Sequence, residues 1–190
     1  MSKQVITYIN ILGMFIISAI LCGAYYFQFR LNEFPCPLCL LQRMCFLGII
    51  FGLYLNLKFG FNPTHYGLSI LSAIIGASIS YRQVLLHICP NPDDHGYGTP
   101  IFGMHLYTWA LIAFVVSIII ISILLLAPKQ FKKKTKKNHL SPTPLFLTEI
   151  AFGIVLILVL TNVFFTFMEC GFGFCPDDPI SYQILNGHWW

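Results

Sequence analysis

Residues 106–127 read LYTWALIAFVVSIIIISILLLA, a run in which most side chains are apolar and none is charged. A helix that crosses a membrane needs about 20 consecutive, mostly apolar residues. Four further stretches meet this requirement, at 5–27, 40–57, 67–88 and 145–168. Continuous apolar runs favour helices over barrel strands as the spanning element. The sequence therefore predicts an all-α integral membrane protein, a four-helix transmembrane bundle followed by a fifth transmembrane helix.

The composition excludes a water-soluble globular protein. Of the 190 residues, 57% are hydrophobic and only 9% are charged, whereas an ordinary soluble domain has about 25% charged residues. The first apolar stretch, 5–27, is longer than the apolar region of a secretory signal, and no small-residue cleavage motif follows it. We therefore expect this stretch to be a retained membrane span.

The basic residues are concentrated in one loop. The net charge is +4, and six of the eleven lysines and arginines fall between residues 129 and 137. Such a cluster indicates membrane topology first, so we expect no nucleic-acid partner. Short basic loops stay in the cytoplasm, which makes 128–144 a cytoplasmic loop that touches membrane lipid. The loops around Cys36 and Cys89 and the tail 169–190 then lie on the other side.

This topology divides the seven cysteines into two groups. Five of them fall on the non-cytoplasmic side: Cys36, Cys39, Cys89, Cys170 and Cys175. The other two, Cys22 and Cys45, lie inside spans and are interpreted as small apolar residues in packed helices. Cys89 precedes Pro90 and is interpreted either as a further exchange partner or as a buried thiol. Outside the cytoplasm cysteines form disulfides, so the five outer cysteines predict thiol–disulfide chemistry.

The motif CPLC at 36–39 opens the second span. Pro37 suits the first turn of a helix, and the partial positive charge at a helix N-terminus favours the thiolate form of a cysteine placed there. Arg43 follows Cys39 by four residues and so lies on the same helix face. An arginine near the membrane is costly unless it is used, so Arg43 is a functional candidate, with snorkelling to the headgroups as the alternative. The same two interpretations hold for Arg82.

A second cysteine pair, Cys170 and Cys175, lies in the sequence ECGFGFCP. The two intervening glycines permit the bend that would join these cysteines. A ring closed by so few residues is strained, and strained exposed disulfides exchange readily. The alternatives are an inert disulfide in the tail, or a zinc site made by the four paired cysteines. No histidine has the spacing that would strengthen a metal site, so no metal is expected.

Three segments together resemble one known family. The segments are FPCPLCLLQR at 34–43, SYRQV at 80–84 and GMHLYTW at 103–109, and they are similar to those of the disulfide bond formation protein B (DsbB) family. The resemblance covers the first four spans and implies a four-helix domain at 1–127 in the bacterial inner membrane. Its most specific element is the P-C-x-x-C motif followed by Gln-Arg.

The resemblance implies a protein dithiol:quinone oxidoreductase. Such an enzyme reoxidises a DsbA-like thioredoxin-fold protein in the periplasm and passes two electrons to a bound quinone, either ubiquinone or menaquinone. By position, Cys36 and Cys39 correspond to the redox pair beside the quinone. Cys39 corresponds to the thiolate that faces the ring, Arg43 to its electrostatic partner, and Arg82 to a further quinone-binding residue.

The sequence departs from the family pattern in its second cysteine pair. The family usually carries that pair between the third and fourth spans, where this chain has only Cys89. We expect Cys170 and Cys175 to replace it from the tail 169–190, accepting electrons from the partner and passing them to Cys36 and Cys39. Two alternatives remain open: a thiol redox protein of the vitamin K epoxide reductase type, and a membrane scaffold with a structural disulfide.

Overall fold

The computed structural model describes residues 3–88, 98–131, 142–173, 175, 179 and 181–187. Within these residues the chain forms helices and a single isolated β-bridge. The long helices are α1 (Lys3–Arg30), α2 (Pro37–Phe59), α3 (Pro63–Leu86), α4 (Leu106–Leu125) and α5 (Pro142–Cys170), with short 3-10 helices η1 (Pro128–Phe131) and η2 (Gln183–Asn186). Five helices are long and apolar enough to cross a membrane. The chain is thus an all-α, multi-pass membrane protein, as the sequence predicts.

The helix ends differ from those of the predicted apolar runs: α1, α2 and α5 extend further at both ends, α3 begins and ends earlier than 67–88, and α4 ends at Leu125. α3 begins at Pro63 after Asn62, whose side chain accepts a hydrogen bond from the Thr64 backbone N–H at 3.0 Å. Such a cap satisfies a donor that the helix itself leaves unpaired. At the other end of the chain, α5 continues to Cys170, so the first cysteine of the tail pair belongs to a helix.

Small residues let α2, α3 and α4 approach one another closely. A Cβ added at Gly52 on α2 would collide with Ser69 on α3, and one added at Gly76 on α3 would collide with the ring of Phe114 on α4. Phe114 also stacks on Phe46 of α2, with ring centroids 4.0 Å apart. Close backbone approach at small residues is a common way for membrane helices to associate, because lipid removes the hydrophobic drive between them.

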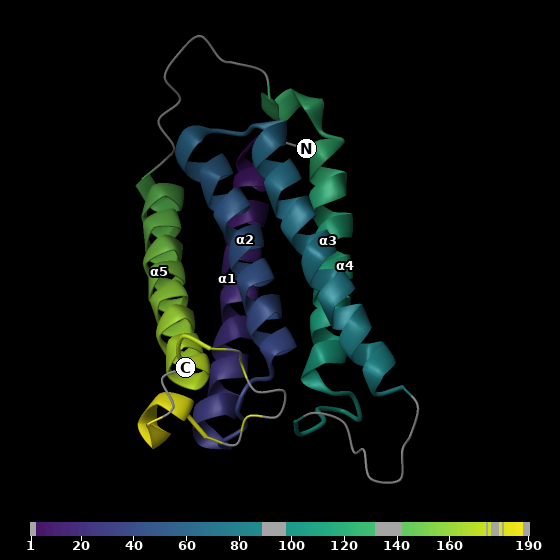
Figure 1. The fold of residues 1–190 in the computed structure, drawn as a ribbon. Helices are drawn as coiled ribbons and strands as arrows, with labels where there is room; N and C mark the ends of the chain where they lie inside the picture. The colour runs from purple at the N-terminus through teal and green to yellow at the C-terminus, as the bar shows by residue number, and fades with distance from the viewer. Residues whose placement is uncertain are drawn as a thin grey trace.

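The fifth helix packs on α1 and α2, on the side away from α3 and α4 (Figure 1). Its inward face is formed by Ala151, Val155, Leu158, Asn162 and Glu169, all buried. Their spacing of three, four or seven residues places them on one side of a helix. The bundle predicted for the first four spans is therefore extended by a fifth helix with its own buried face.

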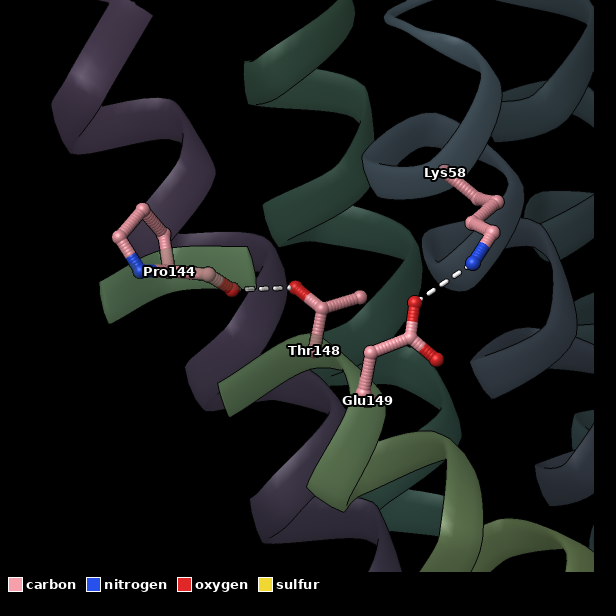
Figure 2. A network of polar contacts seen from close by, with 4 residues as sticks. All are labelled: Lys58, Pro144, Thr148 and Glu149. Atoms are coloured by element: carbon pink, nitrogen blue, oxygen red, sulfur yellow. Dashed lines mark hydrogen bonds and ion pairs between the residues drawn. The ribbon is translucent and has the colours of Figure 1, made fainter. Parts of the chain in front are cut away.

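Two polar contacts lie at the start of α5 (Figure 2). Glu149 forms an ion pair with Lys58 of α2, with 2.6 Å between Oε1 and Nζ. Thr148 donates a hydrogen bond from its hydroxyl to the carbonyl oxygen of Pro144 at 2.7 Å, within the first turns of α5. The ion pair joins the start of α5 to the last turn of α2, whereas the hydrogen bond lies within α5 itself.

Successive helices run in opposite directions (Figure 1). The last turns of α1, α3 and α5 therefore meet the first turns of α2 and α4 at one end of the bundle, here called the cysteine end because Cys36, Cys39 and Cys170 lie there. Several sequence predictions fall outside the described residues. They concern Cys89, the lysines at 132–137 in the basic loop, and most of the tail after Cys175.

Candidate active site

The CPLC motif forms the start of α2. Cys36 is the N-cap, and its sulfur accepts a hydrogen bond from the backbone N–H of Cys39 at 3.2 Å, while Pro37 occupies the first turn. Both cysteines are free thiols; Cys36 is buried and Cys39 is half-buried. Hydrogen bonding with the Cys39 side chain and burial raise the pKa of the Cys36 thiol above its usual range. The thiolate form of Cys36 is therefore disfavoured.

Gln83, on the last turn of α3, reaches across to both sulfurs. Its amide nitrogen lies 3.2 Å from the Cys36 sulfur and 3.6 Å from the Cys39 sulfur, and it donates to each. Its amide oxygen accepts a hydrogen bond from Gln42 of α2 at 2.8 Å. Gln83 is only 2% exposed. It thus fixes the two thiols relative to α3, a role that sequence reasoning missed.

Arg82 lies outside this cluster. It is exposed and is not among the residues that line the cavity described below. Along a helix, consecutive residues are turned by about 100°, so α3 can direct either residue 82 or its neighbour Gln83 towards the cysteines. The structure directs Gln83, and a quinone-binding role for Arg82 stays a prediction.

Arg43 is buried, with a relative exposure of 7%, and its guanidinium faces α1. Nη1 donates to the side-chain oxygen of Gln28 at 2.7 Å and Nη2 donates to the carbonyl oxygen of Ala24 at 3.4 Å. The guanidinium carbon also lies 4.7 Å from the centroid of the Tyr25 ring, a cation–π arrangement. The side chain is therefore held inside the bundle by α1, which disfavours the snorkelling interpretation.

A cavity of about 310 Å³ adjoins the cysteine pair. Its walls come from α1, α2, α4 and the segment before α2, and they include Cys39, Gln42, Arg43, Phe46, Tyr107 and Trp109. Ligand pockets have volumes of roughly 300–1,000 Å³ and combine apolar walls with a few polar groups. This cavity can therefore hold a planar apolar ligand with a thiol and a guanidinium at its wall.

The tail returns to the same end of the bundle. Cys170 and Cys175 are joined in a disulfide, and Gly171, in the left-handed region at φ 61°, turns the chain after α5. Farther along, the Tyr182 ring packs against Phe34, with centroids 4.9 Å apart. The tail therefore lies beside the segment that leads into Cys36.

A polar path also connects the tail to Arg43. The side-chain nitrogen of Gln28 donates to the Tyr182 hydroxyl at 3.3 Å, while the oxygen of the same amide accepts from Arg43. Gln28 is 4% exposed. One amide of α1 thus links the tail to the guanidinium beside the cysteine pair, a contact that the sequence pattern does not reveal.

Glu169, directly before Cys170, is also buried at this end, with 1% of its surface exposed. Among the described residues, neither of its carboxylate oxygens has a hydrogen-bond partner. The sequence analysis assigned residue 169 to the tail 169–190, whereas the structure places it on the last turn of α5. Its helical spacing from Leu158 and Asn162 was the signal that could have placed it on the inward face.

Comparison with known proteins supports the resemblance seen in the sequence. Residues 7–96 match the family model described as "Disulfide bond formation protein DsbB". A relative named "Disulfide bond formation protein B 1" from Pseudomonas fluorescens (strain Pf0-1) is 30% identical over 148 residues, which cover 62% of this chain and 87% of the relative.

The chain belongs to the DsbB family.

Two further relatives, both named "Disulfide bond formation protein B", show how the similarity is distributed. The one from Burkholderia pseudomallei (strain 1106a) is 30% identical over 140 residues, 57% of this chain and 82% of the relative. The one from Xylella fastidiosa (strain Temecula1 / ATCC 700964) is 37% identical over 95 residues, 47% of this chain and 54% of the relative. The chain therefore spans only about half the length of its Xylella relative.

The DsbB family model covers the CPLC motif, Arg43 and Gln83 but ends before α4. The disulfide Cys170–Cys175 and all of α5 therefore lie beyond the matched residues. The names of the family and of these relatives refer to disulfide bond formation.

The remaining free cysteines lie apart from the site. Cys22 is exposed on α1 and Cys45 is half-buried on α2, so only Cys45 fits the packed position expected for both. Within the described part of the chain, no group of three or more histidine, cysteine or acidic side chains is placed to hold a metal ion.

Proposed function

We propose that this DsbB-family chain is a protein dithiol:quinone oxidoreductase of the bacterial inner membrane. It would reoxidise a DsbA-like thiol protein in the periplasm and pass the electrons to a quinone. The observation that carries this proposal is the cavity, which presents Cys39 and Arg43 on an otherwise mostly apolar wall. A fixed positive charge beside a thiol favours the thiolate, which is the form that attacks as a nucleophile and that leaves when a disulfide is broken.

The cavity fits a quinone in size and chemistry. Aromatic and aliphatic walls suit a ring with an apolar tail, and Gln42 and Arg43 can donate hydrogen bonds to a ring oxygen. When bound, the quinone would accept two electrons and two protons, and either ubiquinone or menaquinone supplies this chemistry. The residues of the chain bind and orient it, exclude water and supply the thiols.

The thiol steps run through two cysteine pairs. A thiolate of the partner attacks the Cys170–Cys175 disulfide, and the second partner thiol then displaces the mixed disulfide, leaving the tail pair reduced and the partner oxidised. A thiolate of the tail pair next attacks the oxidised Cys36–Cys39 pair and releases Cys39 as a thiolate. The other tail thiol completes the exchange, so the tail disulfide re-forms and the CPLC pair is reduced.

Arg43 stabilises the released thiolate in this scheme. Its guanidinium is fixed by Gln28 and Tyr25 and lies within electrostatic range of Cys39. A charge held in place before the reaction stabilises a developing anion without reorganisation, and it does so most strongly where water is excluded. During the same step Gln83 keeps the two sulfurs in position, because its amide nitrogen donates a hydrogen bond to each.

The proposal is tested with purified protein in detergent. Quinone reduction is followed with a reduced DsbA-like protein as donor, for the unchanged chain, Cys36→Ser and Cys175→Ser. Cys22→Ser is the matched control, because this thiol is exposed on α1 outside both pairs. We expect the control to retain activity and both test variants to lose it.

Each other outcome removes part of the proposal. Activity that survives Cys175→Ser would show that the tail pair is not needed, and the CPLC pair would then oxidise the partner directly. An unchanged chain that reduces no quinone, together with variants that accumulate poorly, would favour a scaffold with a structural disulfide. Activity with a vitamin K epoxide in place of the quinone would favour the alternative reductase type.

The proposed sidedness has its own test. A membrane-impermeant maleimide is added to spheroplasts after mild reduction, and labelling is read at Cys175, which lies outside the span of α5. We expect labelling without permeabilisation. Labelling only after permeabilisation would place the tail in the cytoplasm and contradict a periplasmic partner.

A further inference from the structure

Glu169 places a buried carboxylate at the cysteine end of the bundle, beside the tail disulfide in sequence. It directly precedes Cys170 on α5, and it lies on the same helix face as Leu158 and Asn162, which pack against α1 and α2. Asn162 accepts a hydrogen bond from the Tyr25 hydroxyl at 3.4 Å, and Tyr25 lies under Arg43. The inward face of α5 therefore leads to the guanidinium.

The surroundings of Glu169 are unusual for an acidic residue. It is 1% exposed, and no described residue donates a hydrogen bond to either carboxylate oxygen. The ionisable groups that face it from α2 are Arg43 and Cys39, both within electrostatic range. On α1 the ionisable group in contact with Arg43 is Tyr25, and in the tail Tyr182 contacts Gln28, which binds Arg43. Arg43 is thus the one cation of this described cluster.

Burial makes the total charge of this cluster important. An unbalanced charge in a low-dielectric site is expensive, whereas a balanced pair costs much less. Glu33 also lines the cavity, but its carboxylate accepts hydrogen bonds from Thr99. While Cys36 and Cys39 form a disulfide, Glu169 is therefore the described carboxylate within electrostatic range of Arg43 that can balance its charge. When Cys39 is released as a thiolate, two anions would face one cation unless one of them takes up a proton.

We propose that Glu169 and Cys39 alternate as the counter-charge of Arg43, with Glu169 taking up a proton each time Cys39 becomes a thiolate. This inference rests on the proposed function, because it concerns the step between the two cysteine pairs. It assigns to the added fifth helix a proton-holding role that the DsbB-matched residues 7–96 do not contain.

The step balances in protons and electrons. The Cys170 thiol gives its proton to the Glu169 carboxylate, and the resulting thiolate attacks the Cys36 sulfur. The Cys170–Cys36 bond forms, the Cys36–Cys39 bond breaks, and the electron pair leaves on Cys39. The cluster then holds Arg43 as a cation, Cys39 as a thiolate and Glu169 as a neutral acid, so its net charge is the same as before.

The test is the number of protons taken up when the CPLC pair is reduced. The protein is equilibrated in detergent with thiol–disulfide buffers between about pH 6 and 8, and each cysteine pair is read separately by alkylation and peptide mass spectrometry. For a two-electron couple, each proton shifts the midpoint potential by about 30 mV per pH unit, the equivalent of a tenfold change in the equilibrium constant. A disturbance of packing moves the midpoint but not this slope.

We expect the unchanged chain to take up two protons, one on Cys36 and one on Glu169, and Glu169→Gln to take up one. Glu169→Asp should restore the two-proton slope. Glu149→Gln is the matched control, because Glu149 lies on the same helix but is half exposed beside Lys58 at the other end of α5. This variant should still take up two protons when the CPLC pair is reduced. Equal slopes in the unchanged chain and Glu169→Gln would overturn the proposal.

A second measurement uses the unchanged chain, in case Glu169→Gln does not fold. The lipid-soluble reagent dicyclohexylcarbodiimide modifies buried carboxyl groups in their protonated form. We expect Glu169 to be modified when Cys36 and Cys39 are reduced and spared when they are joined; equal modification in both states would overturn the proposal. Neither measurement needs quinone or partner, so a chain that fails to reduce quinone can still show the charge exchange.

Discussion

The two ends of the bundle contain buried polar networks of similar construction and different chemistry. At the end opposite the cysteines, Asn10 of α1 donates to the Tyr66 hydroxyl at 2.9 Å, and this hydroxyl donates to Gln130 of η1 at 3.2 Å. At the cysteine end, Gln42 donates to Gln83 at 2.8 Å. In both places amide side chains join helices where lipid supplies no hydrophobic drive between them.

The difference lies in charge and in access. The chain Asn10–Tyr66–Gln130 contains only neutral groups, all buried. The cysteine end adds the Arg43 guanidinium, two free thiols and a cavity. Neutral amide pairs suffice to hold helices together, whereas an intramembrane ionisable group is costly and is retained for function. The comparison therefore predicts activity effects at one end and stability effects at the other.

Replacement of Arg43 should have the largest effect. Arg43→Ala removes the charge that stabilises the Cys39 thiolate, and we expect quinone reduction to slow by at least about 100-fold, the usual loss for a preorganised stabilising group. Arg43→Lys keeps a charge but cannot donate to both Gln28 and Ala24 as the guanidinium does. Its rate of quinone reduction should therefore lie between those of the unchanged chain and Arg43→Ala. Steady-state kinetics with a DsbA-like donor measures both.

The same variants can contradict the expected difference between the two ends of the bundle. If Arg43→Ala kept near-normal kinetics and instead lowered thermal stability, the guanidinium would be a structural group like the amides at the opposite end. The amount of folded protein in detergent is the control, since loss of fold would reduce activity for a different reason.

Replacement of Gln83 should have a smaller effect on activity. Gln83→Leu removes the donor to the Cys36 sulfur and leaves the Gln42 amide without its acceptor, a loss of about 1–3 kcal/mol. We expect quinone reduction to slow about tenfold. Gln83→Glu keeps the acceptor for Gln42 but loses the donor to sulfur, so it separates the two contacts. Activity of Gln83→Glu equal to that of the unchanged chain would show that the contact with sulfur is dispensable.

The neighbouring Arg82 offers a direct check on the sequence interpretation. If Arg82 binds quinone as the family resemblance implies, Arg82→Ala should raise the KM for quinone. Its exposed position outside the cavity lining predicts an unchanged KM instead. The measurement is a quinone titration at saturating donor, with Gln83→Leu beside it.

The sequence predicts the helices well because apolar length alone determines them. It also predicts that Cys39 and Arg43 share a face, because a spacing of four is local to one helix. It does not predict Gln28, Gln83 or Glu169, because these contacts depend on how each helix is rotated against its neighbours. Rotation is set by packing at small residues and aromatic rings from other segments, which no local pattern encodes.

At the opposite end, Tyr66→Phe should affect stability alone. The substitution removes the hydroxyl shared by Asn10 and Gln130 and leaves two buried amides with fewer partners. We expect the free energy of unfolding to fall by about 1–2 kcal/mol, the typical cost of a lost buried hydrogen bond. Thermal unfolding in detergent measures the loss, and quinone reduction by the folded fraction should be unchanged. A slower reaction would mean that the two ends are coupled.

The smallest effect is expected at the Lys58–Glu149 ion pair. The contact is short, at 2.6 Å, yet the two side chains are 42% and 45% exposed. Exposed ion pairs gain little because solvent competes for both charges, so Lys58→Ala should change neither the thermal midpoint nor quinone reduction beyond experimental error. α5 is held instead by its buried face and by ring contacts such as Tyr54 with Phe152, centroids 4.4 Å apart. A clear loss of stability in Lys58→Ala would show that α5 depends on its polar anchor, and the buried position of Glu169 at its far end would then depend on that anchor too.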